Sequence, residues 1–241
     1  MSTTAAKIIA HLKTVDGERA RRADVTGLNA GVIALKAYQQ RRFSHTYADL
    51  LQSPRYGAAS RFFLNELYGP SDFTQRDAQF ARVVPALVRL FPSEIVDTVA
   101  TLAELHALSE TLDTAMARQL DGKSIQAISY VRAWQATGRV DGRQAQISLT
   151  LDVAARLDRF TGRGLVRNSL RLMRGPARAA GLSELQQFLE SGFDTFRKMN
   201  GAGDFVALVE VREHALASAL FEAELAAPGS ASVARALVCL P

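Results

Sequence analysis

Arginine is the residue type whose spacing is most unusual in this sequence. Between residues 156 and 178, seven arginines recur at steps of three or four residues. On one uninterrupted helix, that spacing would place them within an arc of about 120°, at about 100° per residue. Such a face can bind phosphates, an anionic lipid surface or an acidic protein helix. The candidate anion- or partner-binding residues are Arg156, Arg159, Arg163, Arg167, Arg171, Arg174 and Arg178.

Two features favour a plainer interpretation of these arginines as a solvated or ion-paired surface. The glycines between 162 and 164 and the Gly175-Pro176 pair should interrupt a single straight helix. The apolar Val166, Leu170 and Met173 occupy a different helical face, as they would in an ordinary surface helix. We therefore favour the plainer interpretation and keep anion or partner binding as the alternative.

Histidine and carboxylate side chains are the groups that could act as acids, bases or metal ligands. Two pairs lie one helical turn apart, His106 with Glu110 and Glu210 with His214. Di-iron bundles need Glu-x-x-His pairs on two helices, and this sequence has none. Two such pairs on facing helices could hold a metal ion, but a solvated pair on a helix face explains both spacings equally well. We expect no metal site and no cofactor.

Other catalytic arrangements also fail on spacing. No Gly-x-Ser-x-Gly elbow is present to support a Ser-His-Asp triad. The segment from Gly162 to Gly164 lacks the third glycine and the preceding strand of a dinucleotide-binding loop. The single cysteine, Cys239, can form neither an internal disulfide nor a cysteine metal cluster. The sequence therefore favours a non-enzymatic protein.

The segment RFFLNELYGPSDFTQRD, residues 61–77, combines adjacent phenylalanines with polar groups. Phe63 and Leu67 are four residues apart and should face a core. We expect a short helix that Phe62 and Phe63 wedge into a bundle. The alternative is the wall of an apolar pocket. The candidate polar groups of such a pocket, taken over the whole chain, are His45, Glu66, Tyr68, His106 and Glu110.

The same segment resembles the signature of an uncharacterised bacterial family that is named for its FFLEELY motif. Asn65 departs from the motif, because the family name has glutamate at that position. The resemblance implies a helical bacterial protein, and it brings no known activity, cofactor or catalytic residue with it. The matching residues are Phe62, Phe63, Leu64, Glu66, Leu67 and Tyr68.

Charge is distributed along the chain in blocks of alternating sign. The 241 residues carry 29 Lys and Arg against 24 Asp and Glu, a net charge of +5. Residues 1–89 carry about +6 and residues 118–182 about +8, whereas 90–117 and 183–227 carry about −5 each. Such blocks can attract one another within a bundle or across a dimer. We therefore expect neither nucleic acid nor a membrane as a partner.

Helical periodicity runs along nearly the whole chain and predicts an all-α, single-domain bundle of eight to ten helices. With 48% hydrophobic residues, the chain can bury a core. Residues 146–153 are β-branched enough for a strand, but no partner strand is visible and we favour a helix there. The expected helices span 26–52, 58–68, 74–90, 93–120, 124–137, 143–160, 165–174, 183–200 and 204–226.

Three segments are expected from these patterns. Residues 1–23 form a flexible or partly helical N-terminal segment, 24–227 the helical domain, and 228–241 a C-terminal tail that docks or frays. No run approaches the ~20 apolar residues of a membrane span, and the first residues lack the features of a signal peptide. We expect a cytoplasmic protein.

These observations favour a helical protein that binds a protein partner or a small ligand and forms a homodimer. The alternative is an all-helical enzyme or cofactor carrier with an apolar central pocket. A second alternative is the docking of an anion or a nucleic acid on the arginine face.

Overall fold

Twelve α-helices account for most of residues 3–66, 74–120, 124–161, 164–227 and 229–241, which are the residues that the structure, a computed structural model, describes. These residues include no strand, so the all-α prediction is confirmed, with more helices than expected. No described helix is both long and apolar enough to cross a membrane. The helices are α1 (Thr3–Ala23), α2 (Leu28–Thr46), α3 (Ala48–Gln52), α4 (Gly57–Glu66), α5 (Thr74–Leu90), α6 (Ser93–Ala117), α7 (Ala127–Thr137), α8 (Val140–Thr161), α9 (Gly164–Ala179), α10 (Ser183–Lys198), α11 (Gly203–Glu222) and α12 (Ala231–Val238).

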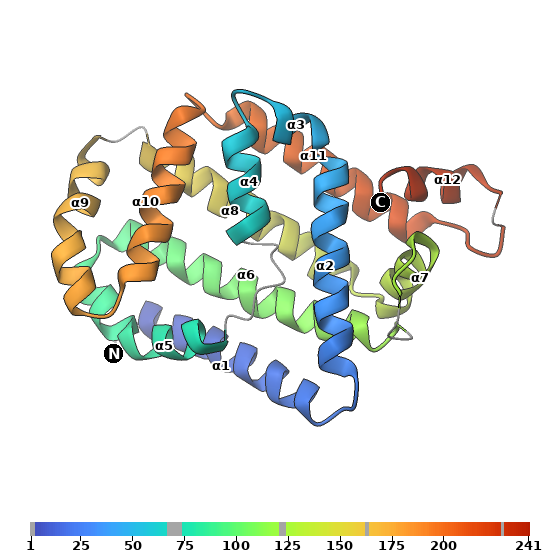
Figure 1. The fold of residues 1–241 in the computed structure, drawn as a ribbon, viewed down its shortest axis with the longest axis horizontal. Helices are drawn as coiled ribbons and strands as arrows, with labels where there is room; N and C mark the ends of the chain where they lie inside the picture. The colour runs from blue at the N-terminus through green and yellow to red at the C-terminus, as the bar shows by residue number, and fades with distance from the viewer. Residues whose placement is uncertain (1–2, 67–73, 121–123, 162–163, 228) are drawn as a thin grey trace.

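Four helices lie in succession and form the body of the fold (Figure 1). Helix α1 packs on α6, α6 packs on α8, and α8 packs on α11. Helix α2 crosses this row and contacts α1 and α6. Helices α9 and α10 form a hairpin at one end of the long axis, and α7 and α12 lie at the other end.

The buried apolar side chains fall into two clusters. The first includes Phe63, Leu87 and Phe196, and the second includes Tyr130 and Leu220. Helices α2, α6, α8 and α11 contribute buried residues to both clusters. Each of these four helices therefore passes from one apolar cluster to the other. The side chains in the middle of these helices fill the space between the two clusters.

Both terminal segments contain a helix. Helix α1 buries Ile8 and Leu12 in the first cluster. Helix α12 buries Val233 and Ala236 in the second cluster. The hydroxyl oxygen of Ser230 accepts a hydrogen bond from the Val233 N–H at 3.3 Å and caps α12, as serine commonly does at a helix start.

Several helix boundaries differ from the expected ones. The single helix expected over 26–52 is divided, since α2 ends at Thr46 and α3 begins at Ala48. The expected break at Gly175-Pro176 is wrong, because α9 continues to Ala179. Pro176 is exposed, so solvent can bond the carbonyl that proline leaves without its usual N–H donor. Residues 146–153 lie within α8, as favoured above.

Candidate functional site

Charged and polar side chains are buried where α2, α6 and α11 pass between the two apolar clusters. On α6, Glu110 and Asp113 lie between Ala103 of the first cluster and Met116 of the second. On α2, Arg42 lies next to Phe43, at the point where the helix enters the first cluster. We call the connected side chains the polar network. Its members are Arg22, Lys36, Gln39, Arg42, Tyr47, Glu110, Asp113, Thr114 and Glu213, and the buried Arg143 acts on Asp113 through its charge.

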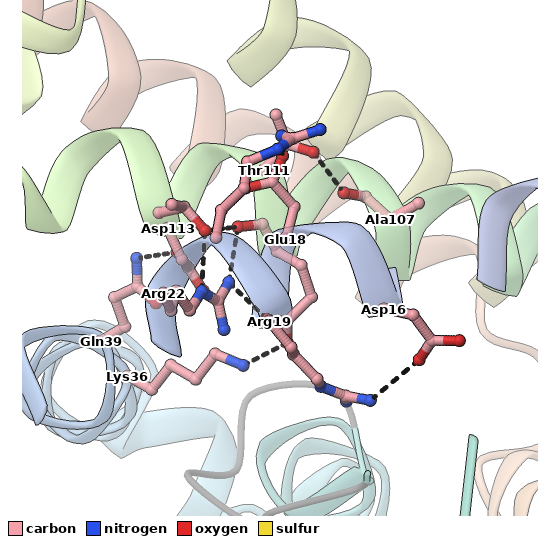
Figure 2. A network of polar contacts seen from close by, with 12 residues as sticks. Asp16, Glu18, Arg19, Arg22, Lys36, Gln39, Ala107, Thr111 and Asp113 are labelled. Atoms are coloured by element: carbon pink, nitrogen blue, oxygen red, sulfur yellow. Dashed lines mark hydrogen bonds and ion pairs between the residues drawn. The ribbon is translucent and has the colours of Figure 1, made fainter. Parts of the chain in front are cut away.

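The best-connected acid of the network is Glu110. Its Oε2 lies 2.6 Å from Nη2 of Arg22, and its Oε1 accepts a hydrogen bond from Nζ of Lys36. The same Arg22 side chain donates to the hydroxyl of Thr114 and to the carbonyl of Glu110, each at 2.8 Å. Figure 2 shows Arg22 and Lys36 reaching α6 from α1 and α2. One carboxylate therefore ties three helices together.

Glu110 and Asp113 lie three residues apart on α6 and have pKa values shifted in opposite directions. Burial alone would raise the pKa of Glu110, but the charge and hydrogen bond of Lys36, with the charges of Arg22 and His106, hold it below the usual value. Burial raises the pKa of Asp113, against the charges of Lys36 and Arg143. Oδ1 of Asp113 accepts a hydrogen bond of 3.1 Å from the side-chain amide of Gln39 (Figure 2).

A second part of the network joins α2 to α11. Nη1 of Arg42 lies 2.6 Å from Oε1 of Glu213, and the Tyr47 hydroxyl donates to the same oxygen at 2.7 Å. Tyr130 on α7 links the two parts electrostatically. Its buried hydroxyl has a raised pKa, caused chiefly by burial, and it is also influenced by the charges of Arg42 and Asp113.

Aromatic rings border this polar network on the side of the second cluster. The guanidinium of Arg143 lies 4.1 Å from the ring centroid of Trp134, within the range of a cation–π contact. The rings of Tyr38 and Tyr130 are 4.7 Å apart. The Tyr38 hydroxyl is buried without a hydrogen-bond partner among the described residues, and burial raises its pKa to about 12. Its proton is therefore held at neutral pH.

The geometry of the polar network indicates a structural role. Glu110 and Glu213 each contact a basic side chain on another helix, and Asp113 contacts an amide. A general base needs a free, reachable lone pair beside a substrate. Glu110 and Asp113 are buried and Glu213 is half-buried, and each is held by a basic or amide side chain. No group of three or more His, Cys, Asp and Glu side chains suited to a metal ion occurs in the described ranges.

The predicted pocket residues lie in different parts of the fold. His106 and Glu110 lie one turn apart on α6, close enough for the histidine to influence the pKa of Glu110. His45 is exposed near the end of α2, and its Nε2 bonds the carbonyl oxygen of Val238 at 3.1 Å. Lys36, which contacts Glu110, precedes His45 by nine residues, or about 14 Å along a helix. Glu66 is the last residue of α4, and Tyr68 lies outside the described residues.

The FFLNE part of the sequence motif contributes two core side chains. Phe62 packs on Phe188 of α10, with ring centroids 5.2 Å apart. Phe63 contacts Phe196 of α10 at 5.8 Å and Phe205 of α11 at 5.9 Å. The expectation that these phenylalanines wedge a short helix into the bundle agrees with these contacts.

The predicted arginine residues divide between α8 and α9, and three of them form ion pairs. Arg156 binds Asp152 one turn earlier on α8, at 2.8 Å. Two arginines of α9 pair with α10, Arg167 with Asp194 at 3.3 Å and Arg174 with Glu190 through two hydrogen bonds of 2.7 and 2.5 Å. Arg163 lies outside the described residues. The arginines that are exposed and have no ion-pair partner in the described ranges are Arg159, Arg171 and Arg178.

An open groove of about 370 Å³ runs between α9 and α10. Gln186 is buried at its floor, where its side-chain amide donates to the carbonyl of Leu170 and to Glu190, both at 2.6 Å. Its carbonyl oxygen has no hydrogen-bond partner among the described residues. The groove thus combines basic, acidic and amide groups. Its lining residues are Arg174, Arg178, Ser183, Gln186, Gln187, Glu190, Ser191 and Asp194.

Most members of the polar network were missed by the sequence analysis, although the sequence contains a signal for two of them. On α2, Leu28, Val32 and Leu35 recur at helical spacing, and Arg42 continues that series at a core position. On α6, Glu110 lies seven residues after the buried Ala103, also on the core-facing stripe. Charged residues at core positions indicate buried ion pairs, because an isolated buried charge is costly.

Comparison with known proteins identifies a family for most of the chain. The model of a domain of unknown function, DUF8198, matches residues 18–227. Comparisons with curated proteins and with solved structures gave no match. The matched range contains α2 to α11, and with them the polar network and the groove between α9 and α10. The chain therefore belongs to the family of proteins with this domain of unknown function.

Proposed function

We propose that this protein is a non-enzymatic binding protein that holds an acidic segment of a protein partner on the arginine face of α9, beside the groove between α9 and α10. The observation that carries the proposal is that Arg171 and Arg178 are exposed and unpaired within the described part of the chain. Both side chains are exposed, and neither forms an ion pair or a hydrogen bond with an acidic side chain among the described residues, although the charge of Arg171 helps to lower the pKa of Glu190. Arg178 lines the groove between α9 and α10, and Arg171 lies seven residues before it, on the same helical face.

The composition of the groove favours a protein partner over a nucleic acid. Glu190 and Asp194 line it together with Arg174 and Arg178, and both acids are already paired with arginines of α9. A polypeptide can present carboxylates to the arginines and amide groups to Ser183 and Gln187. Leu172, which is 78% exposed on the adjoining face of α9, supplies an apolar contact of the kind that protein interfaces use.

Other properties belong to the same proposal. Membership in the bacterial FFLEELY-motif family is supported by Phe62, Phe63, Leu64 and Glu66 of α4. A cytoplasmic location is supported by the lack of any membrane-crossing helix in the part of the chain that the structure describes. A homodimer is supported by the general frequency of two-fold association. The enzyme alternative is less well supported, because the acids of the polar network are buried and engaged.

A charge-reversal experiment tests the proposal. A fluorescein-labelled poly-glutamate peptide is titrated with the wild-type protein, with Arg171→Glu/Arg178→Glu and with Arg118→Glu/Arg132→Glu, and anisotropy is recorded. Arg118 directly follows α6 and Arg132 lies on α7; both are exposed, so the control changes net charge equally. We expect at least a tenfold loss of affinity in the α9 variant only, and weaker wild-type binding at higher salt.

Three results would contradict the proposal. Equal losses in both double variants would mean that net charge, and not the α9 face, holds the peptide. Binding that does not respond to salt would exclude an arginine–carboxylate contact. Tighter binding of a labelled duplex DNA of equal charge would favour the nucleic-acid alternative.

A further inference from the structure

Helix α9 has three strips of side chains along its length, as successive residues turn by about 100°. Leu170 and Ala177 lie on a strip that is buried in the first apolar cluster. The arginines lie on a second strip, which faces α10. Figure 1 shows α9 at the extreme end of the long axis, beyond α10. A third strip is exposed there and carries no charge, and we call it the outer strip. Its described residues are Asn168, Leu172, Gly175, Pro176 and Ala179.

The arginines of α9 alternate between those that pair with α10 and those that do not. Arg167 and Arg174 form ion pairs with acids of α10. Arg171 and Arg178 each follow one of them by four residues, which turns the side chain about 40° further around the helix axis. That rotation is toward the outer strip. The two arginines that form no ion pair among the described residues therefore border the exposed, uncharged surface of α9.

The outer strip has the form of a hole for a side chain of another helix. Four residues at i, i+3, i+4 and i+7 frame such a hole in knobs-into-holes packing, and on this strip they are Leu172, Gly175, Pro176 and Ala179. A Cβ atom built at Gly175 would meet nothing within 4 Å in the described part of the chain, so the hole is open. The small Gly175 and Ala179 allow a second helix to approach to about 8–10 Å between axes.

The arginines have the position that charged residues occupy beside a seam between two helices. If Leu172, Gly175 and Ala179 are heptad positions a, d and a, then Arg171 and Arg178 are both g positions. Residues at g form ion pairs across the seam with opposite charges on the second helix. The two arginines are seven residues apart, or about 10.5 Å along the axis. Matching carboxylates on the second helix are therefore also seven residues apart.

We infer that the outer strip binds an acidic amphipathic α-helix of a protein partner. One apolar side chain of that helix enters the hole beside Leu172, and two carboxylates, seven residues apart, pair with Arg171 and Arg178. The inference rests on the proposed function, because it uses the same two arginines, and it adds the conformation and the residue spacing of the partner segment. An amphipathic helix offers an apolar row and a charged row side by side, as α9 does.

The same features match an anionic lipid surface less well. Binding to such a surface grows with the buried apolar area and with the number of free basic residues. Leu172 is the only large apolar side chain among the five residues of the outer strip. Two of the described arginines of α9 are already paired with acids, and a free one contributes only about 1 kcal/mol at a lipid surface. A flat surface also makes no use of the hole at Gly175.

Two fluorescein-labelled peptides of identical composition test the inference. The patterned peptide has three heptads with leucine at a and d, glutamate at e and g, and alanine elsewhere; the scrambled peptide has the same residues without this pattern. Anisotropy is recorded with the wild type, with Gly175→Phe, which fills the hole, and with Gly203→Phe. Gly203 is the matched control, because it is exposed at the start of α11 and a Cβ there also meets nothing within 4 Å. The wild type and Gly203→Phe should bind the patterned peptide about tenfold more tightly than the scrambled one, and Gly175→Phe should bind both equally.

The outcomes separate this inference from the proposed function. Equal binding of the two peptides by the wild type, or an unchanged preference in Gly175→Phe, would overturn the helix inference. The proposed function would still stand if Arg171→Glu/Arg178→Glu weakened the binding of poly-glutamate. Failure of every acidic peptide to bind would overturn both. Sedimentation of the wild type, but not of Leu172→Ser, with phosphatidylserine vesicles, together with equal binding of the two peptides, would assign the outer strip to a lipid surface instead.

Discussion

The carboxylate of Glu110 lies 2.6 Å from the guanidinium of Arg22, and both side chains are at most 4% exposed. Lys36 binds the other oxygen of the same carboxylate, so one acid on α6 neutralises charges from α1 and α2. A buried ion pair of this kind is not necessarily more stabilising than apolar packing, but breaking it leaves an uncompensated charge in the core. Glu110 is therefore a position where a small chemical change has a large expected effect.

Glu110→Gln should destabilise the protein severely. The amide keeps the shape of the side chain but leaves Arg22 and Lys36 without their negative partner, which costs about 3–5 kcal/mol for a buried pair. The free energy of unfolding is measured by urea denaturation followed by circular dichroism. Glu104→Gln is the control, because Glu104 is exposed on the same helix; its effect should stay within about 0.5 kcal/mol. Equal effects at the two positions would contradict the buried ion pair.

Asp113→Asn should leave the protein at least as stable as the wild type at neutral pH. Burial raises the folded-state pKa of Asp113, so folding favours the neutral acid. Asparagine is neutral at every pH and can still accept the hydrogen bond from Gln39. At neutral pH the wild type must ionise Asp113 in the folded core, which lowers its free energy of unfolding. Each unit by which the pKa is raised lowers that free energy by about 1.4 kcal/mol.

The pH dependence gives the sign of this effect. Asp113 in the unfolded chain ionises near pH 3.9, and in the folded chain at a higher pH. The wild type therefore loses stability relative to Asp113→Asn as pH rises through that window, and the difference is constant above it. Unfolding free energies of both proteins between pH 3 and pH 8 provide the check, with the exposed Asp97→Asn as control. A difference that grows as pH falls would contradict the raised pKa.

The helices of this fold could be predicted from local sequence, and the polar network could not. The apolar stripe and its flanking turn residues predicted α10 and α11 to within a few residues, because the 3.6-residue period depends only on near neighbours. The contact of Lys36 with Glu110 joins residues 74 positions apart, and that of Arg42 with Glu213 joins residues 171 positions apart. Such pairs depend on the packing order of the helices, which periodicity does not contain.

The arginine spacing predicted a shared face only in part. Arg167, Arg171, Arg174 and Arg178 lie on one strip of α9, whereas Arg156 and Arg159 belong to α8. Which of them bind acids depends on α10, since its Glu190 and Asp194 approach from another helix. The arginine spacing on α9 was visible in the sequence. The sequence did not show that Arg167 and Arg174 pair with acids of α10 whereas Arg171 and Arg178 form no ion pair among the described residues.

Gly57→Ala should destabilise the start of α4. A Cβ atom at residue 57 would lie 2.7 Å from the carbonyl oxygen of Leu51, which already accepts a hydrogen bond from Arg61. Because a backbone atom must move, we expect a loss of about 1–3 kcal/mol, as for other overpacked sites. Gly175→Ala is a matched control, since its Cβ would meet nothing within 4 Å on helix α9. It should stabilise the protein by about 0.5–1 kcal/mol through helix propensity. Thermal unfolding of both variants should therefore shift in opposite directions, and equal shifts would contradict the close contact at Leu51.

Phe63→Ala tests whether the FFLNE segment acts through packing. Phe63 is 4% exposed and contacts the rings of Phe196 and Phe205, so its truncation should cost about 3–5 kcal/mol of unfolding free energy. Asn65→Glu, which introduces a glutamate at an exposed position of the segment, should change stability by less than about 0.5 kcal/mol. If Asn65→Glu instead altered stability as much as Phe63→Ala, residue 65 would matter to the fold as much as the ring contacts of Phe63, and packing alone would not explain the segment. Urea denaturation of both variants separates these two explanations. The denaturation midpoints report the change in stability provided that the slope of the transition is unchanged.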